Sequence, residues 1–276
     1  MQKVLYKKEL YSVSDLIGKE VTDYIAAGGI ETFESHDGFD IISFDWHNIA
    51  DPGADASEIV IYLDRENLFL FCADESGYRM AQSCFRQANA NSRALYDFFS
   101  RMMAGDMAHL ETLERNIYAI EDDLMERTDR ADIMEILNVR YELFDLKCYY
   151  QQLVSIFECF EENDNRLLTE KSLRWFSILE NRADRFFDRT VSLREIVSQV
   201  REAYQSQIDI EQNRLMRVFT VVTTVFLPLS LLVGWYGMNF RDMPELEWKY
   251  SYPVFIAVCL GVAGALLLLF RKKKWF

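Results

Sequence analysis

Small and polar side chains recur at helical spacing through an apolar stretch near the C-terminus. Alternating steps of three and four residues pass through eight positions, here called the seam: Asn213, Met216, Thr220, Thr223, Leu227, Ser230, Gly234 and Gly237. Amide and hydroxyl oxygens on one helix face can replace part of the water around a cation. If copies of this helix surround an axis, the seam lines a pore. The alternatives are close helix packing through small residues, and threonine hydroxyls that bond only their own backbone.

From Thr220 onward the seam lies in the first of two runs without Asp, Glu, Lys, Arg or His, at residues 218–240 and 251–270. A helix of this length crosses roughly 30 Å of hydrocarbon. We therefore expect two membrane spans, at about residues 217–237 and 251–270, joined by a short loop. Two buried core helices of a soluble protein are the alternative interpretation.

Basic residues flank the two spans and leave the connecting loop mixed in charge. They precede the first span and follow the second: Arg214, Arg217, Arg271, Lys272, Lys273 and Lys274. The positive-inside rule then predicts a multi-pass protein of the inner (cytoplasmic) membrane with both termini in the cytoplasm. The charged first ten residues, MQKVLYKKEL, contain no apolar core typical of a signal peptide. The basic side chains form either a ring at the inner mouth or anchors for anionic headgroups.

Four short stretches at the C-terminus resemble the CorA family of magnesium transport proteins: YGMNF at 236–240, MPEL at 243–246, WKYSYP at 248–253 and RKKKWF at 271–276. The resemblance implies a homopentamer whose first span lines the pore, with Gly237, Met238 and Asn239 as the outer selectivity entrance. Five Asn239 amides would hold a hydrated Mg²⁺, which sheds water reluctantly. Glu245, in the outer loop, would concentrate cations. A helix C-cap is the alternative role for the glycine and the asparagine.

The resemblance also implies apolar constrictions at Met216 and Leu227, and gating by cytoplasmic Mg²⁺ bound to carboxylates between subunits. The candidate regulatory acids are Glu180, Asp184, Glu202 and Asp209, whereas Ile178 occupies the position where the family's stalk carboxylate is expected. Mg²⁺ is expected as the transported ion and a candidate regulator, without any other cofactor. Transport of Co²⁺, Ni²⁺ or Zn²⁺, a membrane-anchored scaffold that transports nothing, and a proton-coupled mechanism stay open.

A long stalk helix is expected to begin near Thr169 or Ser172 and to continue without a breaker into the first span. Extending the seam backwards gives nine polar positions: Asn181, Arg185, Asp188, Ser192, Glu195, Gln199, Glu202, Ser206 and Asp209. Ordinary amphipathicity can explain such a face, but its continuity with the seam favours a water-filled funnel. Apolar periodicity before it predicts two long antiparallel helices, with breaks near residues 128–131 and 161–165.

The N-terminal residues carry strand signals at 39–46, 58–65 and 67–73, and a helix at 12–29 that ends at Gly28 and Gly29. We thus predict an α+β membrane protein in three parts. These are a small cytoplasmic α/β module at 1–88, a cytoplasmic helical bundle and stalk at 89–212, and a transmembrane hairpin at 213–276.

Charge and composition narrow the functional class. Of 44 acidic and 30 basic residues, only three acidic and eight basic ones lie from Asn213 onward, so residues 1–212 carry a net charge of −19. Such a part repels nucleic acid and concentrates cations. The five cysteines and three histidines lack metal-ligand spacing, and no phosphate loop or nucleophile motif is present. The expected protein is not an enzyme, and its partners are divalent cations, the lipid bilayer and further copies of itself.

Overall fold

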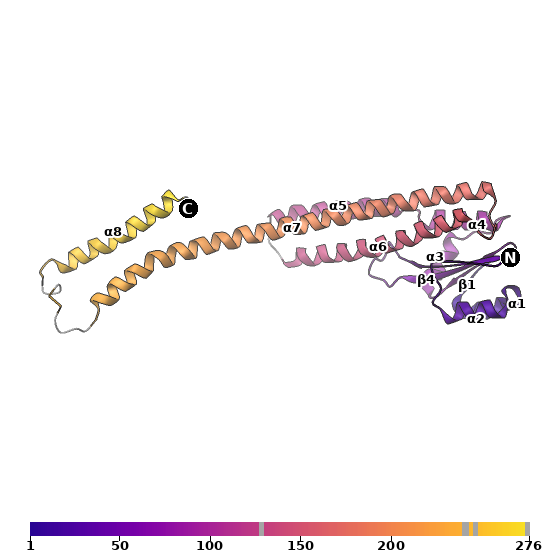
Figure 1. Cartoon of the computed structure of the whole chain (residues 1–276), viewed down its shortest axis with the longest axis horizontal. Coiled ribbons are helices and arrows are strands. Elements are labelled where there is room, and N and C mark those ends of the chain that lie inside the picture. The colour runs from indigo at the N-terminus through magenta and orange to yellow at the C-terminus, as the bar shows by residue number, and fades with distance from the viewer. Residues whose placement is uncertain (127–129, 239–242, 245–247, 274–276) are drawn as a thin grey trace. The chain divides into compact units, whose positions relative to one another are not determined.

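A computed structural model describes residues 1–126, 130–238, 243–244 and 248–273, except for the side chains of 125–126 and 130–133. The chain separates into two compact units, Met1–Arg201 and Glu202–Phe276. The predicted α+β class is confirmed, with an N-terminal α/β module, long helices and two apolar helices at the C-terminal end (Figure 1). The boundaries of the predicted three-part division stay a prediction.

The N-terminal module contains a five-stranded sheet with the order β1-β5-β4-β3-β2. Strands β3 (Phe39–Trp46), β4 (Ser57–Asp64) and β5 (Leu68–Cys72) confirm the three predicted strands. Strands β1 (Gln2–Tyr6) and β2 (Phe33–His36) were not predicted. Both lie at the edges of the sheet and are short and partly exposed, so they lack the apolar run that marks the central strands.

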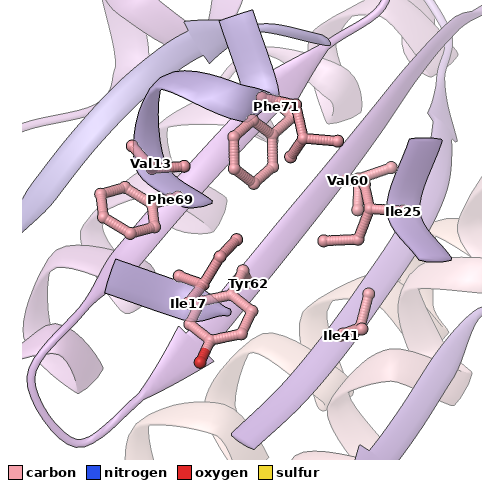
Figure 2. Packing of buried hydrophobic residues seen from close by; sticks show 9 residues of the cluster. Val13, Ile17, Ile25, Ile41, Val60, Tyr62, Phe69 and Phe71 are labelled. Atoms are coloured by element: carbon pink, nitrogen blue, oxygen red, sulfur yellow. The ribbon is translucent and has the colours of Figure 1, made fainter. Parts of the chain in front are cut away.

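One face of the sheet is covered by the helical segment that follows β1. The predicted helix at 12–29 is in fact three pieces: η1 (Lys7–Val13), α1 (Ser14–Ile17) and α2 (Lys19–Ala27). The chain breaks at Gly18, whose φ of +89° suits a residue without Cβ. Side chains from both layers form a closed apolar core: Leu10, Val13, Ile17, Ile25, Ile41, Val60, Tyr62, Phe69 and Phe71 (Figure 2).

The other face of the sheet packs on helices. Helix α3 (Glu75–Cys84) is followed by α4 (Asn91–Met102), and the ring of Phe44 on β3 lies 5.8 Å from Phe99 on α4. Phe99 in turn meets Phe157 on α6 (Arg130–Glu162), with ring centroids 5.0 Å apart. The backbone N–H of Asp45 donates to the side-chain oxygen of Gln152, 3.1 Å away. The module and the bundle therefore share one interior.

Three long helices, α5 (Asp106–Glu126), α6 and α7 (Glu170–Tyr236), follow α4 in the chain. Helix α5 is separated from α4 at Gly105, which has a φ of +104°, so the first predicted bundle helix is divided. The predicted break at 161–165 is confirmed, because α6 ends at Glu162 and α7 begins after a short connection. The predicted turn near 128–131 falls partly outside the described residues.

Helix α7 is a single helix of 67 residues, which confirms the predicted continuity of the stalk with the first span. Together with α8 (Ser251–Lys272) it is one of two described helices that are long and apolar enough to cross a membrane. Protein buries only 6% of the most apolar stretch of α7 and none of that of α8, so neither is the core helix of a soluble domain. Their apolar surfaces are left for lipid or for other copies.

Candidate ion-conduction site

The seam is an uncovered face of α7. All eight of its residues are exposed, including Met216 at 59% and Leu227 at 71%. The covered positions of the span follow a different line, with Val221 buried and four neighbours half-buried: Val225, Pro228, Leu229 and Leu232. None of these belongs to the seam. The side of the span that carries amide, hydroxyl and small side chains is thus free within this chain.

Two grooves separate α7 from α8 on the covered side. One, of about 500 Å³, is lined by Leu232 and Tyr236 of α7 and by Phe255 of α8, and the rings of Tyr236 and Phe255 lie 5.3 Å apart. The other, of about 580 Å³, is bordered by Pro228 together with two seam residues, Thr223 and Leu227. The seam therefore borders this groove at its middle, and at Gly237 it borders the first groove as well.

The seam threonines use their protons locally. The hydroxyl of Thr220 donates to the carbonyl oxygen of Met216 at 2.7 Å, and that of Thr223 donates to Phe219 at 2.8 Å. This is the back-bonding considered above as an alternative. It leaves the lone pairs of both exposed oxygens unused, and a hydroxyl in this state can still accept a bond from the water that surrounds a cation.

The C-terminal end of α7 turns out of helical geometry at Gly237 and Met238. The N–H of Gly237 donates to the carbonyl oxygen of Val233 at 2.9 Å, and that of Met238 approaches Trp235 at 3.4 Å. Gly237 is not among the described residues with a positive φ, so the left-handed C-cap role considered for it is wrong. A Cβ at Gly237 would instead lie 3.0 Å from the Val233 oxygen. Asn239 and Glu245 lie outside the described residues.

Exposed positive charge lies where the first span begins and where the second span ends. Arg214 and Arg217 on α7 are exposed, as are Arg271 and Lys272 in the last turn of α8 and Lys273 directly after it. Within the described part of the chain, none of these five forms an ion pair. Lys274 lies outside the described residues.

The candidate regulatory acids do not assemble into a site within one chain. Glu202 and Asp209 are exposed, and Asp209 accepts a long bond of 3.4 Å from the Gln205 amide. Glu180 is half-buried, and burial followed by the charges of Glu161, Glu158 and Asp184 raises its pKa. Across the described residues, no three His, Cys, Asp or Glu side chains are placed to hold one metal ion.

The polar line that continues the seam backwards is exposed along α7. In the first unit its members are Asn181, Arg185, Asp188, Ser192, Glu195 and Gln199, and in the second they are Glu202, Ser206 and Asp209. A different stripe of α7 is buried in the first unit: Phe176, Leu179, Ala183, Phe186, Thr190, Leu193, Val197 and Val200. Ile178 is 56% exposed. The predicted polar face is therefore the uncovered face.

Sequence reasoning missed a set of buried titratable residues in the first unit. Asp106 is 2% exposed and accepts a bond of 3.1 Å from the Tyr150 hydroxyl. Burial, as the largest influence, raises the pKa of Asp106 to about 6. His47 and His109, which appeared scattered, both lie near Glu142 on α6. No spacing in the sequence reveals this proximity, because three separate elements create it.

Comparisons with known proteins point to one family. Residues 19–272 match the family described as CorA-like Mg²⁺ transporter protein. The cobalt/magnesium transport protein CorA of Thermotoga maritima is 28% identical over 181 residues, covering 66% of this chain but only 52% of that protein. The magnesium transport protein CorA of Haemophilus influenzae is 28% identical over 275 residues, covering 94% of this chain and 86% of that protein.

A solved structure shares the fold of this chain. The complete structure of the CorA magnesium transporter from Methanocaldococcus jannaschii matches this chain with a TM-score of 0.80 at 19% sequence identity. The match covers 100% of this chain and 90% of the other. At that identity the likeness is one of fold alone.

Proposed function

Because this chain belongs to the CorA family of Mg²⁺ transporters, we propose that it is a homopentameric channel that moves Mg²⁺ into the cytoplasm down its electrochemical gradient. The transported ion is also the candidate regulator, and no other cofactor takes part. The protein is a multi-pass protein of the inner (cytoplasmic) membrane with both termini in the cytoplasm. Its partners are Mg²⁺, lipid and its own copies.

The observation that carries the proposal is the uncovered seam. Polar and small side chains inside a membrane span are costly against lipid and are normally turned towards protein or water. In this chain neither α8 nor any other described element covers them. Copies of α7 around an axis remove the seam from lipid and give it a water-filled path, with Asn213, Thr220, Thr223 and Ser230 as its polar lining.

The tripeptide Gly237-Met238-Asn239 is the proposed outer entrance. Five Asn239 amide oxygens bind a hydrated Mg²⁺ weakly enough to release it, which conduction requires. Glu245 draws cations towards this entrance. The exposed Met216 and Leu227 narrow the path as apolar constrictions, and the basic residues Arg217 and Arg271 to Lys274 surround its inner end or hold anionic headgroups.

Gating by cytoplasmic Mg²⁺ is part of the proposal. The acids Glu180, Asp184, Glu202 and Asp209 are offered as regulatory ligands shared between subunits, because one chain brings no three of the described acids onto one ion. When the ion leaves, like charges across an interface repel and favour separation. The exposed Ile178 cannot contribute a charge, so feedback in this protein depends on the remaining acids.

Co²⁺ transport is the alternative that a specific observation favours, since the Thermotoga maritima relative is named a cobalt/magnesium transport protein. Transport of Ni²⁺ and Zn²⁺ is a further alternative, and the flux experiment below tests it together with Co²⁺. A scaffold that is merely tethered by its hairpin is the alternative of a different class, and a proton-coupled carrier is a third.

The test is flux into liposomes loaded with a Mg²⁺-sensitive dye, with the wild type compared to Asn239→Ala and with Co²⁺, Ni²⁺ and Zn²⁺ offered in turn. We expect Mg²⁺ uptake that follows the membrane potential, that Asn239→Ala abolishes and that Mg²⁺ on the cytoplasmic face suppresses. Val222→Ala is the matched control, because Val222 is exposed in the span and lies about 200° around the helix from Thr220 of the seam.

Each other result has a distinct meaning. Uptake that Asn239→Ala leaves intact contradicts the entrance, and uptake that needs a proton gradient favours the carrier. Uptake insensitive to cytoplasmic Mg²⁺ removes the carboxylate sensor but keeps the channel. If correctly inserted protein conducts none of the four ions, the scaffold is the interpretation that remains.

A further inference from the structure

His47 is a buried histidine whose Nε2 has no hydrogen-bond partner among the described residues. The side chain follows β3 directly and is only 4% exposed. Its Nε2 is one of two buried polar side-chain atoms without a hydrogen bond among the described residues, the other being the Ser57 hydroxyl. A neutral imidazole can leave one nitrogen unpaired at modest cost, but a charged imidazolium needs acceptors for two N–H groups.

The residue lies where the N-terminal sheet meets the helical bundle. Two residues earlier, Asp45 bonds across this contact to Gln152 of α6. The charged and titratable groups that act on His47 come from both neighbouring helices: Asp145 and Glu142 on α6, and His109 on α5. These groups decide whether a proton on His47 can be accommodated in the packed state.

Neither carboxylate is placed to accept a hydrogen bond from the additional N–H of a protonated His47. Glu142 is engaged by Nε2 of His109 at 2.7 Å. Asp145 is exposed to water and makes no hydrogen bond to His47. The two carboxylates offset part of the desolvation of an imidazolium, yet burial, as the largest influence, lowers the pKa of His47. The packed state therefore favours neutral His47.

The sign of the resulting pH dependence follows from linkage. A histidine whose pKa is lowered in the packed state is protonated first where it is hydrated, so the packing weakens as pH falls through the usual imidazole range near about 6.5. At higher pH the imidazole is neutral in both states, and the contact keeps its full stability.

We propose that His47 makes the packing of the N-terminal sheet on helices α5 and α6 sensitive to protons, so that acidification loosens this contact. The ligand is the proton, and the responsive element is the junction between β3 and the bundle. This inference goes beyond the proposed channel function and does not depend on it, because the junction lies within the first unit and its opening can be measured without any ion flux.

The experiment is amide hydrogen exchange of the full chain in detergent micelles at about pH 8 and about pH 5.5, which bracket the unperturbed histidine pKa. After correction for intrinsic exchange, we expect protection of β3 and of the facing part of α6 to fall by up to about tenfold in the wild type, because pH 5.5 lies about one unit below the unperturbed histidine pKa. His47→Gln and His47→Leu should both remove the fall.

His36→Gln is the matched control, since His36 lies in the same module but bonds to Glu34 at 3.1 Å on a partly exposed edge. It should leave the fall in protection unchanged. A wild type whose protection does not depend on pH overturns the proposal, as does a fall that persists in the folded His47 variants. Two His47 variants are used, one polar and one apolar, so that the result does not depend on the correct folding of a single variant.

Discussion

Gly237 shows how a single residue can matter through what it lacks. Its N–H donates to the Val233 carbonyl at 2.9 Å, and an added Cβ would lie 3.0 Å from the same oxygen. Because that oxygen belongs to the backbone and is held by the hydrogen bond, it cannot swing aside as a flexible side chain would. The glycine at the start of the tripeptide is thus favoured by close approach rather than by its φ angle, since an added Cβ needs the Val233 oxygen to give by a few tenths of an ångström.

We expect Gly237→Ala to disturb the end of α7 and to lower Mg²⁺ flux in the liposome assay at least several-fold. Gly234→Ala is the matched control, since a Cβ there meets no atom within 4 Å and favours the helix. Equal flux from both alanine variants would show that the close approach at Gly237 has no consequence for the entrance.

Asp106 gives a second prediction, with the opposite sign to that of His47. A carboxyl whose pKa is raised to about 6 by burial contributes stability below its unfolded pKa, and this contribution is lost as pH rises through about 6. Relative to Asp106→Asn, the wild type should therefore gain up to about 3 kcal/mol of unfolding free energy between about pH 7.5 and about pH 4.

The measurement is chemical or thermal unfolding of the first unit's signal in the full chain, for both proteins across this pH range. Asn can still accept the Tyr150 hydroxyl bond, so the variant isolates the charge. Parallel pH profiles for the two proteins would mean that Asp106 does not titrate on unfolding.

Residues of this kind define the limit of what the sequence predicts. The seam could be read from spacing, because helical periodicity relates positions three and four residues apart. The proximity of His47, His109 and Glu142 could not, because it arises from a strand and two helices that meet only in the folded unit. The same holds for the close contact of Gly237 with Val233, which the glycine-cap rule explained wrongly.

At the scale of elements, α7 divides its surface between a buried stripe and an exposed polar line. Neighbouring residues illustrate the division, since Leu179 is 1% exposed and Ile178 is 56% exposed. Leu179→Ala should lower the unfolding free energy of the first unit by about 2–5 kcal/mol, as expected for a large-to-small change in a core.

Ile178→Ala, one position away on the same helix, is the control and should change stability by less than about 0.5 kcal/mol. Denaturant titration of both variants checks the pair. A larger loss from Ile178→Ala would mean that this exposed position is covered in the assembled protein.

The elements themselves were predictable where burial is strong. Strand β5 is fully buried, β4 is nearly so, and β3 is buried at half of its positions. All three carry β-branched or aromatic runs, so their apolar pattern could be recognised in the sequence. The edge strands β1 and β2 form because partners align them, and this tertiary effect leaves little trace in five or four residues. Gly18 and Gly105 were overlooked as helix breaks because each interrupts a pattern that is otherwise helical.

At the scale of the whole molecule, one chain leaves its polar line and its seam without partners. The proposed assembly brings equivalent positions of α7 close to one another, and a cysteine on the polar line reports this directly. In a Cys148→Ser background, which removes the exposed native thiol, Ser206→Cys should form covalent multimers with a short bismaleimide in native membranes.

Ser198→Cys is the matched control, because Ser198 is also exposed on α7 but lies off the polar line. We expect it to cross-link much less. Multimers of equal yield from the two positions would contradict an axis lined by the polar face, and the largest multimer observed gives the number of copies.

The covered positions of α7 have one more consequence, which concerns chain length. Val200 and Val221 are buried on either side of residues 201–220, in which no side chain is fully buried, and they stand 21 residues apart. This separation is three times seven residues, and seven residues make almost two helical turns. An insertion or deletion there meets no core, yet each added residue rotates everything beyond it by about 100°. Natural length variation in this segment is therefore expected to favour steps of about seven, eleven or eighteen residues, which turn the helix beyond it by no more than about 20°.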